Sequence, residues 1–204
     1  EQREVIYAER MQVLNGENMR GVIMKMLTDI VEGAVDMSIG DEQSPEKWNF
    51  KELNELLLPI IPLKPVELND EIRGMKKDQL KHALKEAATK LYEAKEAEFP
   101  DGEQIREVER VVLLKVIDNK WMSHIDDMEQ LRQGIGLQAY GQRDPLVEYK
   151  MSAYEMFDDM TSAIREDTIR ILCHIRVEQK VEREPAAKVT GTNKDDSAAR
   201  APQR

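Results

Sequence analysis

Every side-chain type of a hydrolytic triad occurs in one short stretch, at Ser123, His124, Asp126 and Asp127. A triad requires nucleophile, base and carboxylate to converge on one substrate, whereas neighbouring positions of a helix point in diverging directions. We therefore expect a polar helix face, with a packing or hydrogen-bonding role for His124 and Asp127. A metal-dependent hydrolase built around these two residues is the weakest alternative, because a metal site needs more donors.

Cys173 and His174 are two further potential metal ligands. Adjacent side chains on a helix point about 100° apart, and no second Cys or His pair with ligand spacing accompanies them. Cys173 is the single cysteine of the chain, which excludes an internal disulfide. We expect it to be a small apolar side chain in a helix interface. His82 lies among lysines and is predicted at the surface, so no residue is predicted to bind metal.

The composition disfavours several classes of function. The 204 residues contain 30 Lys+Arg and 40 Asp+Glu, a formal net charge of −10. Non-specific nucleic-acid binding relies on clustered basic residues, so no nucleic-acid partner is expected. Neither a Gly-x-x-x-x-Gly-Lys-Ser/Thr loop nor a Gly-x-Gly-x-x-Gly turn occurs, so this segment is not expected to bind or hydrolyse ATP alone. No apolar run is long enough to cross a membrane.

Helical periodicity dominates the chain and predicts an all-α fold with long helices. Apolar residues recur at steps of three and four over 19–34, which predicts an amphipathic helix. Helix should return over about 71–99, within a small helical insert that also holds irregular Pro-rich loops. We expect the helices to break at four places: Asn15-Gly16, Gly40 with Ser44-Pro45-Glu46, the stretch 59–65 with its three prolines, and Pro100-Asp101-Gly102.

The strongest periodicity predicts an antiparallel αα-hairpin. Its first helix should end near Gly134 in a glycine-rich loop, and Asp144-Pro145 supplies an N-cap and a first-turn proline for the second helix. A helical arm over 113–137 would be roughly 37 Å long. The two apolar stripes comprise Ile105, Val108, Val112, Leu114, Ile117, Trp121, Ile125, Met128, Leu131 and Ile135, and then Ala153, Phe157, Met160, Ile164, Ile171 and Ile175.

The glycines between the two helices predict a mobile tip that presents Ile135, Leu137 and Tyr140. Exposed apolar side chains at such a tip suggest contact with a partner, and folding back onto the hairpin is the alternative. Methionines at helical spacing are expected to fill the core, with an adaptable binding surface as the alternative. The apolar period is lost after Glu184, which predicts a disordered tail. The chain opens at Glu1 inside a helix-like pattern, so we expect it to be part of a longer protein.

Residues 116–149, which run VIDNKWMSHIDDMEQLRQGIGLQAYGQRDPLVEY, closely resemble the SecA family, the motor ATPases of bacterial preprotein translocation. The opening segment 2–10, QREVIYAER, is also similar to that family, and the resemblance covers about residues 1–180. It implies four parts: 1–38 and 104–180 as the helical scaffold, 39–103 as the inserted helical wing, and 181–204 as a disordered C-terminal linker.

The resemblance also implies a function for the hairpin. It would be the two-helix finger, whose loop enters the SecY channel, touches the unfolded preprotein and restrains the ATPase. The family's fingertip tyrosine falls on Tyr140. The implied contact residues are Ile135, Gly136, Leu137, Gln138, Ala139, Tyr140, Gly141 and Gln142. ATP and magnesium would bind to the motor domains of the longer protein, which would be cytoplasmic and peripherally associated with the inner face of the plasma membrane.

This sequence departs from the family pattern at the tip. Gly136 stands where the family usually has His, and Gln138 stands where it has a basic residue, so the loop should be more flexible and less positive. The family's Cys-rich zinc motif is absent from these residues. Apolar stripes that would meet missing domains could also pair two copies into a homodimer. The alternative function is a non-enzymatic helical adaptor that binds partner helices through the hairpin.

Overall fold

The computed structural model describes residues 1–16, 19–41, 44–138 and 144–176. In that part of the chain every regular element is a helix and no strand occurs, which confirms the all-α prediction. The helices are α1 (Gln2–Asn15), α2 (Met19–Ile39), the 3₁₀ turn η1 (Pro45–Lys47), α3 (Phe50–Leu57), α4 (Asp70–Arg73), α5 (Lys77–Glu96), α6 (Gly102–Gln138) and α7 (Pro145–His174).

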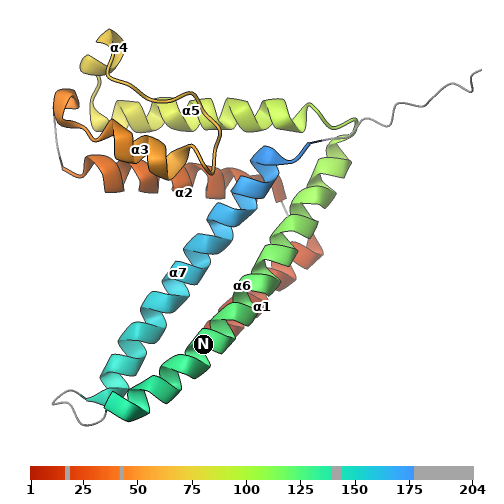
Figure 1. Ribbon diagram of the computed structural model, residues 1–204. Coiled ribbons are helices and arrows are strands. Elements are labelled where there is room, and N and C mark those ends of the chain that lie inside the picture. The colour runs from red at the N-terminus through yellow and green to blue at the C-terminus, as the bar shows by residue number, and fades with distance from the viewer. Residues whose placement is uncertain (17–18, 42–43, 139–143, 177–204) are drawn as a thin grey trace, which may run out of the picture.

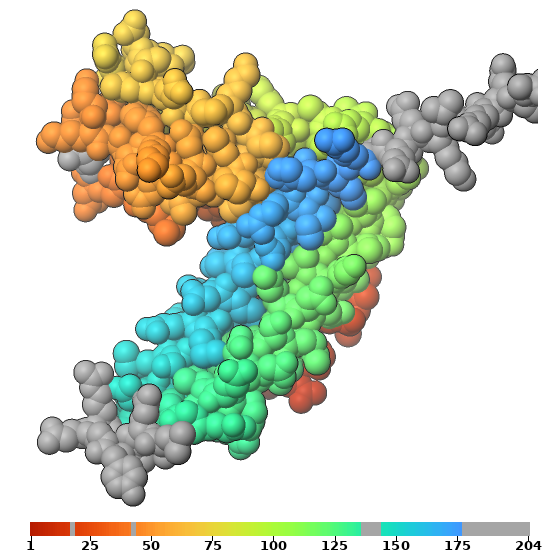
Figure 2. Space-filling model, in the orientation of Figure 1, coloured from red at the N-terminus to blue at the C-terminus, as the bar shows by residue number. Residues whose placement is uncertain are grey.

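The helices form two parts, a long hairpin and a broader part at one of its ends, and the two meet at an angle (Figure 1). Helices α6 and α7 lie side by side and antiparallel along most of their length, and α1 packs against α6. Helix α2 packs against α3 and α5, and these form the broader part at one end of the hairpin. The space-filling view shows the hairpin extending away from that part (Figure 2). The predicted antiparallel hairpin is therefore confirmed.

Local capping signals set most of the helix ends. Gly16 has φ of +71° and ends α1 in the left-handed conformation that glycine adopts without steric cost. The Asp144 side chain accepts a hydrogen bond from the Leu146 backbone N–H at 2.9 Å, with Pro145 in the first turn of α7. The break at Pro100-Asp101-Gly102 is also confirmed, because α5 ends at Glu96 and α6 begins at Gly102.

The predicted continuous helix over 71–99 is wrong at its start. The chain forms the short α4 instead, pauses over residues 74–76 and then begins α5. Each helix has its own cap: the Asn69 side chain accepts from the Ile72 N–H at 2.8 Å, and Gln79 Oε1 accepts from the Lys76 N–H at 2.7 Å. Such side-chain caps compete with a continuous helical ladder.

The larger apolar core lies inside the broad part and extends to the end of α7. Its fully buried members include Leu27, Leu53 and Tyr92, from α2, α3 and α5. Ile169, Leu172 and Cys173 of α7 complete it. Burial of this kind is the main source of stability in helical domains. The broad part and the base of the hairpin therefore share one core.

A second apolar core joins α1 to the hairpin. Its buried residues are Ile6, Val13, Met19, Leu113, Val116, Ile117, Met160 and Ile164. Several residues of the predicted stripes lie outside both cores, and two of them, Ile125 and Ile171, are each 44% exposed. Ile125 lies on the part of α6 beyond the buried contact, whereas Ile171 lies between the buried Ile169 and Leu172 and faces away from the core. Among the described residues, no helix has the length and apolar character that a membrane crossing requires.

Candidate interaction site on the helical hairpin

The hairpin is firmly held at its root, where it leaves the broad part. Leu113 and Ile117 of α6 and Ile164 of α7 are at most 3% exposed. Lys120 Nζ of α6 lies 2.6 Å from Asp167 Oδ2 of α7, and this ion pair joins the two arms of the hairpin. The neighbouring positive charges hold the pKa of Asp167 below its ordinary value, although burial acts against them. Apolar burial and this ion pair fix the root geometrically.

His124 joins α1, α6 and α7 above the root. Its ring is 4% exposed, with its centroid 5.6 Å from that of Trp121 and 5.8 Å from that of Phe157. Nε2 lies 3.0 Å from Gln2 Oε1, while Gln2 Nε2 donates to the Ala153 carbonyl at 2.9 Å. Burial lowers the pKa of His124, and the negative charge of Asp127 opposes that shift. One amide side chain thus bridges both arms of the hairpin.

The structure does not bring Ser123, His124 and the two aspartates together as a catalytic triad. His124 faces the helix interface, whereas Ser123, Asp126 and Asp127 are exposed on α6. The hydrogen bond of the ring is to Gln2 rather than to Asp127. The predicted packing role of His124 is confirmed. Within the part of the chain that the structure describes, no three His, Cys, Asp or Glu side chains are grouped as metal ligands would be.

Cys173 and His174 point to different surroundings. Cys173 is 4% exposed inside the larger core, which confirms its predicted apolar role. Burial raises the pKa of its thiol to about 11, so the reactive thiolate is scarce at neutral pH. His174 is exposed, and its Nδ1 lies 2.7 Å from the Arg170 carbonyl oxygen. His82 is exposed on α5, as predicted.

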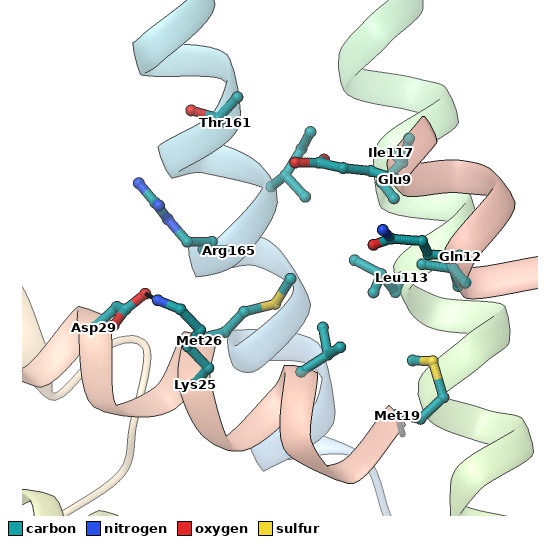
Figure 3. Close-up of a pocket in the computed structure, with 13 residues that line it drawn as sticks. Glu9, Gln12, Met19, Lys25, Met26, Asp29, Leu113, Ile117, Thr161 and Arg165 are labelled. Atoms are coloured by element: carbon teal, nitrogen blue, oxygen red, sulfur yellow. Dashed lines mark hydrogen bonds and ion pairs between the residues drawn. The ribbon is translucent and has the colours of Figure 1, made fainter. Parts of the chain in front are cut away.

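A cavity of about 450 Å³ lies between α1, α2, α6 and α7 beside the root. Figure 3 shows Leu113 and Ile117 on one side of it and Arg165 of α7 on the other. Glu9 lines the cavity from α1, where burial raises the pKa of its carboxyl and the charge of Arg165 partly offsets the effect. The contact between α1 and the hairpin is therefore open on this side.

The far half of the hairpin has few buried side chains. Among the side chains that the structure describes in residues 125–135 and 144–159, Ala153 alone is buried. Val147, Met151 and Tyr154 are 51%, 60% and 73% exposed and follow each other at i, i+4 and i+7. This spacing puts them on one outward face of α7. This face was not predicted from the sequence, although its helical spacing is a signal that the sequence contains.

The predicted contact residues divide into three groups. Ile135 lies in α6 and is partly buried. Gly136, Leu137 and Gln138 form the last residues of α6, so the prediction that the loop starts near Gly134 is wrong for the backbone. Glycine in a helix costs only about 1 kcal/mol, which the neighbouring turns can offset. Ala139, Tyr140, Gly141 and Gln142 lie outside the described residues.

The methionines occupy both of the environments that the sequence allowed, the apolar core and the exposed surface. Met19 and Met160 are buried in the second core, as core-filling residues. Met37, Met122 and Met151 are 60–70% exposed. Methionine side chains adapt to partners of different shape. The exposed ones lie on α2, α6 and α7 and provide apolar surface at separate places.

Comparison with known proteins finds relatives along nearly the whole chain. The SecA Wing and Scaffold domain family matches residues 1–176. The chain is 68% identical over 203 residues to the protein translocase subunit SecA of Lachnoclostridium phytofermentans, covering 99% of this chain and 24% of that protein. It is 43% identical over 202 residues to the SecA subunit of Caldicellulosiruptor saccharolyticus, covering 97% and 23%.

A further relative, protein translocase subunit SecA 1 of Alkaliphilus metalliredigens, is 41% identical over 202 residues, covering 98% of this chain and 23% of that protein. The chain therefore spans about a quarter of the length of the curated relatives that it matches.

Proposed function

Because this chain belongs to the SecA family and forms its wing and scaffold region, we propose that it transmits ATP-driven motion to the tip of the hairpin within a protein translocase. The motion originates in motor domains outside these residues, where ATP and magnesium bind. The tip meets an unfolded preprotein at the SecY channel, and the whole protein works in the cytoplasm against the inner face of the plasma membrane. The hairpin also restrains the ATPase.

One observation carries this proposal: the hairpin is anchored in two cores at its root and has few buried residues beyond His124. Helix α6 has 37 residues, so it is about 55 Å long at the usual rise. An arm that is fixed at one end and paired only with its antiparallel neighbour at the other behaves as a lever. A small tilt at the root then becomes a larger displacement of the tip.

Tyr140 is the residue that we propose to contact the preprotein. An aromatic ring contacts apolar side chains of any sequence, and its hydroxyl can bond to backbone groups. Ile135, Leu137 and the other predicted tip residues would surround that contact. Gly136 and Gln138 make the tip less positive than is usual in the family, so an apolar grip by Tyr140 matters more here.

Replacement of the tip tyrosine tests this function. In the full-length translocase, Tyr140→Ala should reduce preprotein translocation by about tenfold while basal ATP hydrolysis falls less than twofold, on the scale of one lost aromatic contact. Translocation into vesicles and phosphate release are measured side by side. Tyr154→Ala, on the exposed face of α7, is the matched control. Equal losses of translocation and hydrolysis in Tyr140→Ala would remove the tip from the mechanism.

The exposed face of α7 supports a second function, as an adaptor. Val147, Met151 and Tyr154 resemble the i, i+4, i+7 pattern with which helices meet partner helices. An adaptor would bind its partner without coupling to ATP hydrolysis. Binding that is lost in Tyr154→Ala but kept in Tyr140→Ala would favour this reading over the lever.

A further inference from the structure

A fully buried pair of polar side chains links the insert to the hairpin. Tyr92 of α5 and Glu109 of α6 are each 0% exposed. The Tyr92 hydroxyl donates to Glu109 Oε1 at 2.5 Å. Buried carboxylates are rare in soluble proteins unless they are well paired. This pair spans the corner where α5 turns into α6.

Charged residues extend the pair to a third helix. Arg106 Nη2 lies 3.1 Å from Glu109 Oε1 and also bonds to Glu96. Arg20 of α2 donates from Nε to the same Glu96 carboxylate at 3.1 Å. We call Arg20, Tyr92, Glu96, Arg106 and Glu109 the α5–α6 joint. Its members converge from three helices on one small volume.

The joint contains unsatisfied atoms. Within the described residues, Glu109 Oε2 and Arg106 Nη1 are buried without a hydrogen-bond partner. Buried polar groups normally have partners, and exceptions cluster where a structure holds strain or changes its arrangement. Burial raises the pKa of Glu109, while the hydrogen bond from Tyr92 and the charge of Arg106 oppose that shift. The joint therefore combines directional bonds with a desolvation cost for the Glu109 carboxyl.

The apolar core that α5 shares with α7 holds the two parts together, and the polar joint adds directional bonds to that contact. The two helices meet at the corner 97–101 and then diverge (Figure 1). Apolar contacts are non-directional, whereas hydrogen bonds fix orientation. A second polar tie lies close by, since Lys95 Nζ donates to the Ile175 carbonyl at the end of α7 at 3.1 Å. Directional bonds thus gather in the last turns of α5.

We propose that the α5–α6 joint is a latch that fixes the angle between the insert and the hairpin, with Glu109 as its positioning residue. When the latch is closed, the two parts move as one body. When water enters and the Tyr92–Glu109 bond is lost, the insert can swing relative to the hairpin. A desolvated polar cluster favours two discrete arrangements over gradual bending. The consequence for translocation rests on the proposed function, whereas the latch itself does not.

The swing can be measured as a distance between two exposed sites. Spin labels at His82→Cys on α5 and Asp126→Cys on α6 report the angle in the full-length translocase by pulsed electron resonance. Cys173 is buried and should remain unlabelled. We expect one narrow distance for the unaltered joint. Tyr92→Phe keeps the ring but removes the donor, and should raise the second population about tenfold.

Two Glu109 variants separate positioning from simple core filling. Glu109→Ala should open the latch as Tyr92→Phe does. Glu109→Gln keeps the size and an acceptor for Tyr92, and should restore the narrow distance. Lys90→Gln removes an exposed pair with Glu86 on the same helix and is the matched control, with no expected change. Unchanged distances in both Tyr92→Phe and Glu109→Ala would overturn the latch.

The pH profile gives an independent readout. Because closure raises the pKa of Glu109, the closed form holds its proton more tightly, and protonation favours closure. The open population should therefore grow as the pH rises from the ordinary carboxyl pKa through the raised one. The groups that face Glu109 are Tyr92 and Glu96 from α5, Arg106 from α6 and Arg20 from α2. Glu109→Gln should remove this dependence, and a persistent dependence would contradict the assignment to Glu109.

Translocation by the same variants keeps the two proposals apart. A swinging insert with a reduced rate of translocation supports both. A swinging insert with an unchanged rate supports the latch and contradicts the transmission of motion through this region.

Discussion

At the scale of single residues, burial determines the roles of the titratable and nucleophilic side chains. His124, Cys173 and Glu109 would be reactive or titratable groups in water, yet all three are at most 4% exposed. His124 has become a bridge through Gln2 and Cys173 a part of the larger core. Glu109 has become a hydrogen-bond acceptor between helices. None of these environments follows from residue type alone.

The buried imidazole predicts a pH dependence of stability. The folded pKa of His124 lies below its ordinary value, so the unfolded chain binds the proton more tightly. Stability contributed by neutral His124 should be complete above the ordinary pKa and lost as the pH falls through the lowered one. Urea unfolding of the chain between about pH 7.5 and pH 5 measures this loss, which His124→Gln should reduce.

His82→Gln is the control for that experiment, because His82 is exposed on α5. Its loss should leave the pH dependence of the unfolding midpoint unchanged. A His124→Gln variant that keeps the full dependence would show that other groups, such as the partly buried Glu9, cause it.

At the scale of elements, the hairpin is a pair of long helices of which one end is packed in a core. Capping predicted the helix ends well, since Asn15-Gly16 and Asp144-Pro145 act within one turn of the chain. Which residues of the apolar stripes are buried could not be predicted in the same way. Ile125 and Ile171 keep the helical period and are still exposed, because burial depends on which other helix lies opposite.

A matched pair on α7 tests this distinction. Ile164 is 3% exposed and Ile171 is 44% exposed. Ile164→Ala should cost about 2–5 kcal/mol of unfolding free energy because it leaves a cavity. Ile171→Ala should change it by about 0.5 kcal/mol. Chemical denaturation of the chain compares the two, and similar losses would mean that α7 packs differently from this arrangement.

At the scale of the whole molecule, the broad part and the hairpin meet through a shared apolar core and through the α5–α6 joint. The all-α fold, the hairpin and the small insert could be predicted, because periodicity and proline positions are local features of the sequence. The joint could not, since Tyr92 and Glu109 lie on different predicted helices and neither has a motif. The outward face at Val147, Met151 and Tyr154 could not be predicted either, because helical spacing of apolar residues does not by itself distinguish a buried face from an exposed one.

The central claim is that the hairpin tip touches the moving polypeptide during translocation. Crosslinking from Tyr140→Cys to a stalled preprotein in the full-length translocase tests it most directly. Cys173 should not compete, because it is buried and burial raises the pKa of its thiol to about 11. We predict a crosslink that requires both ATP and the SecY channel. Translocation that proceeds without any crosslink, while the introduced thiol remains reactive, would contradict the claim and leave the hairpin as a scaffold.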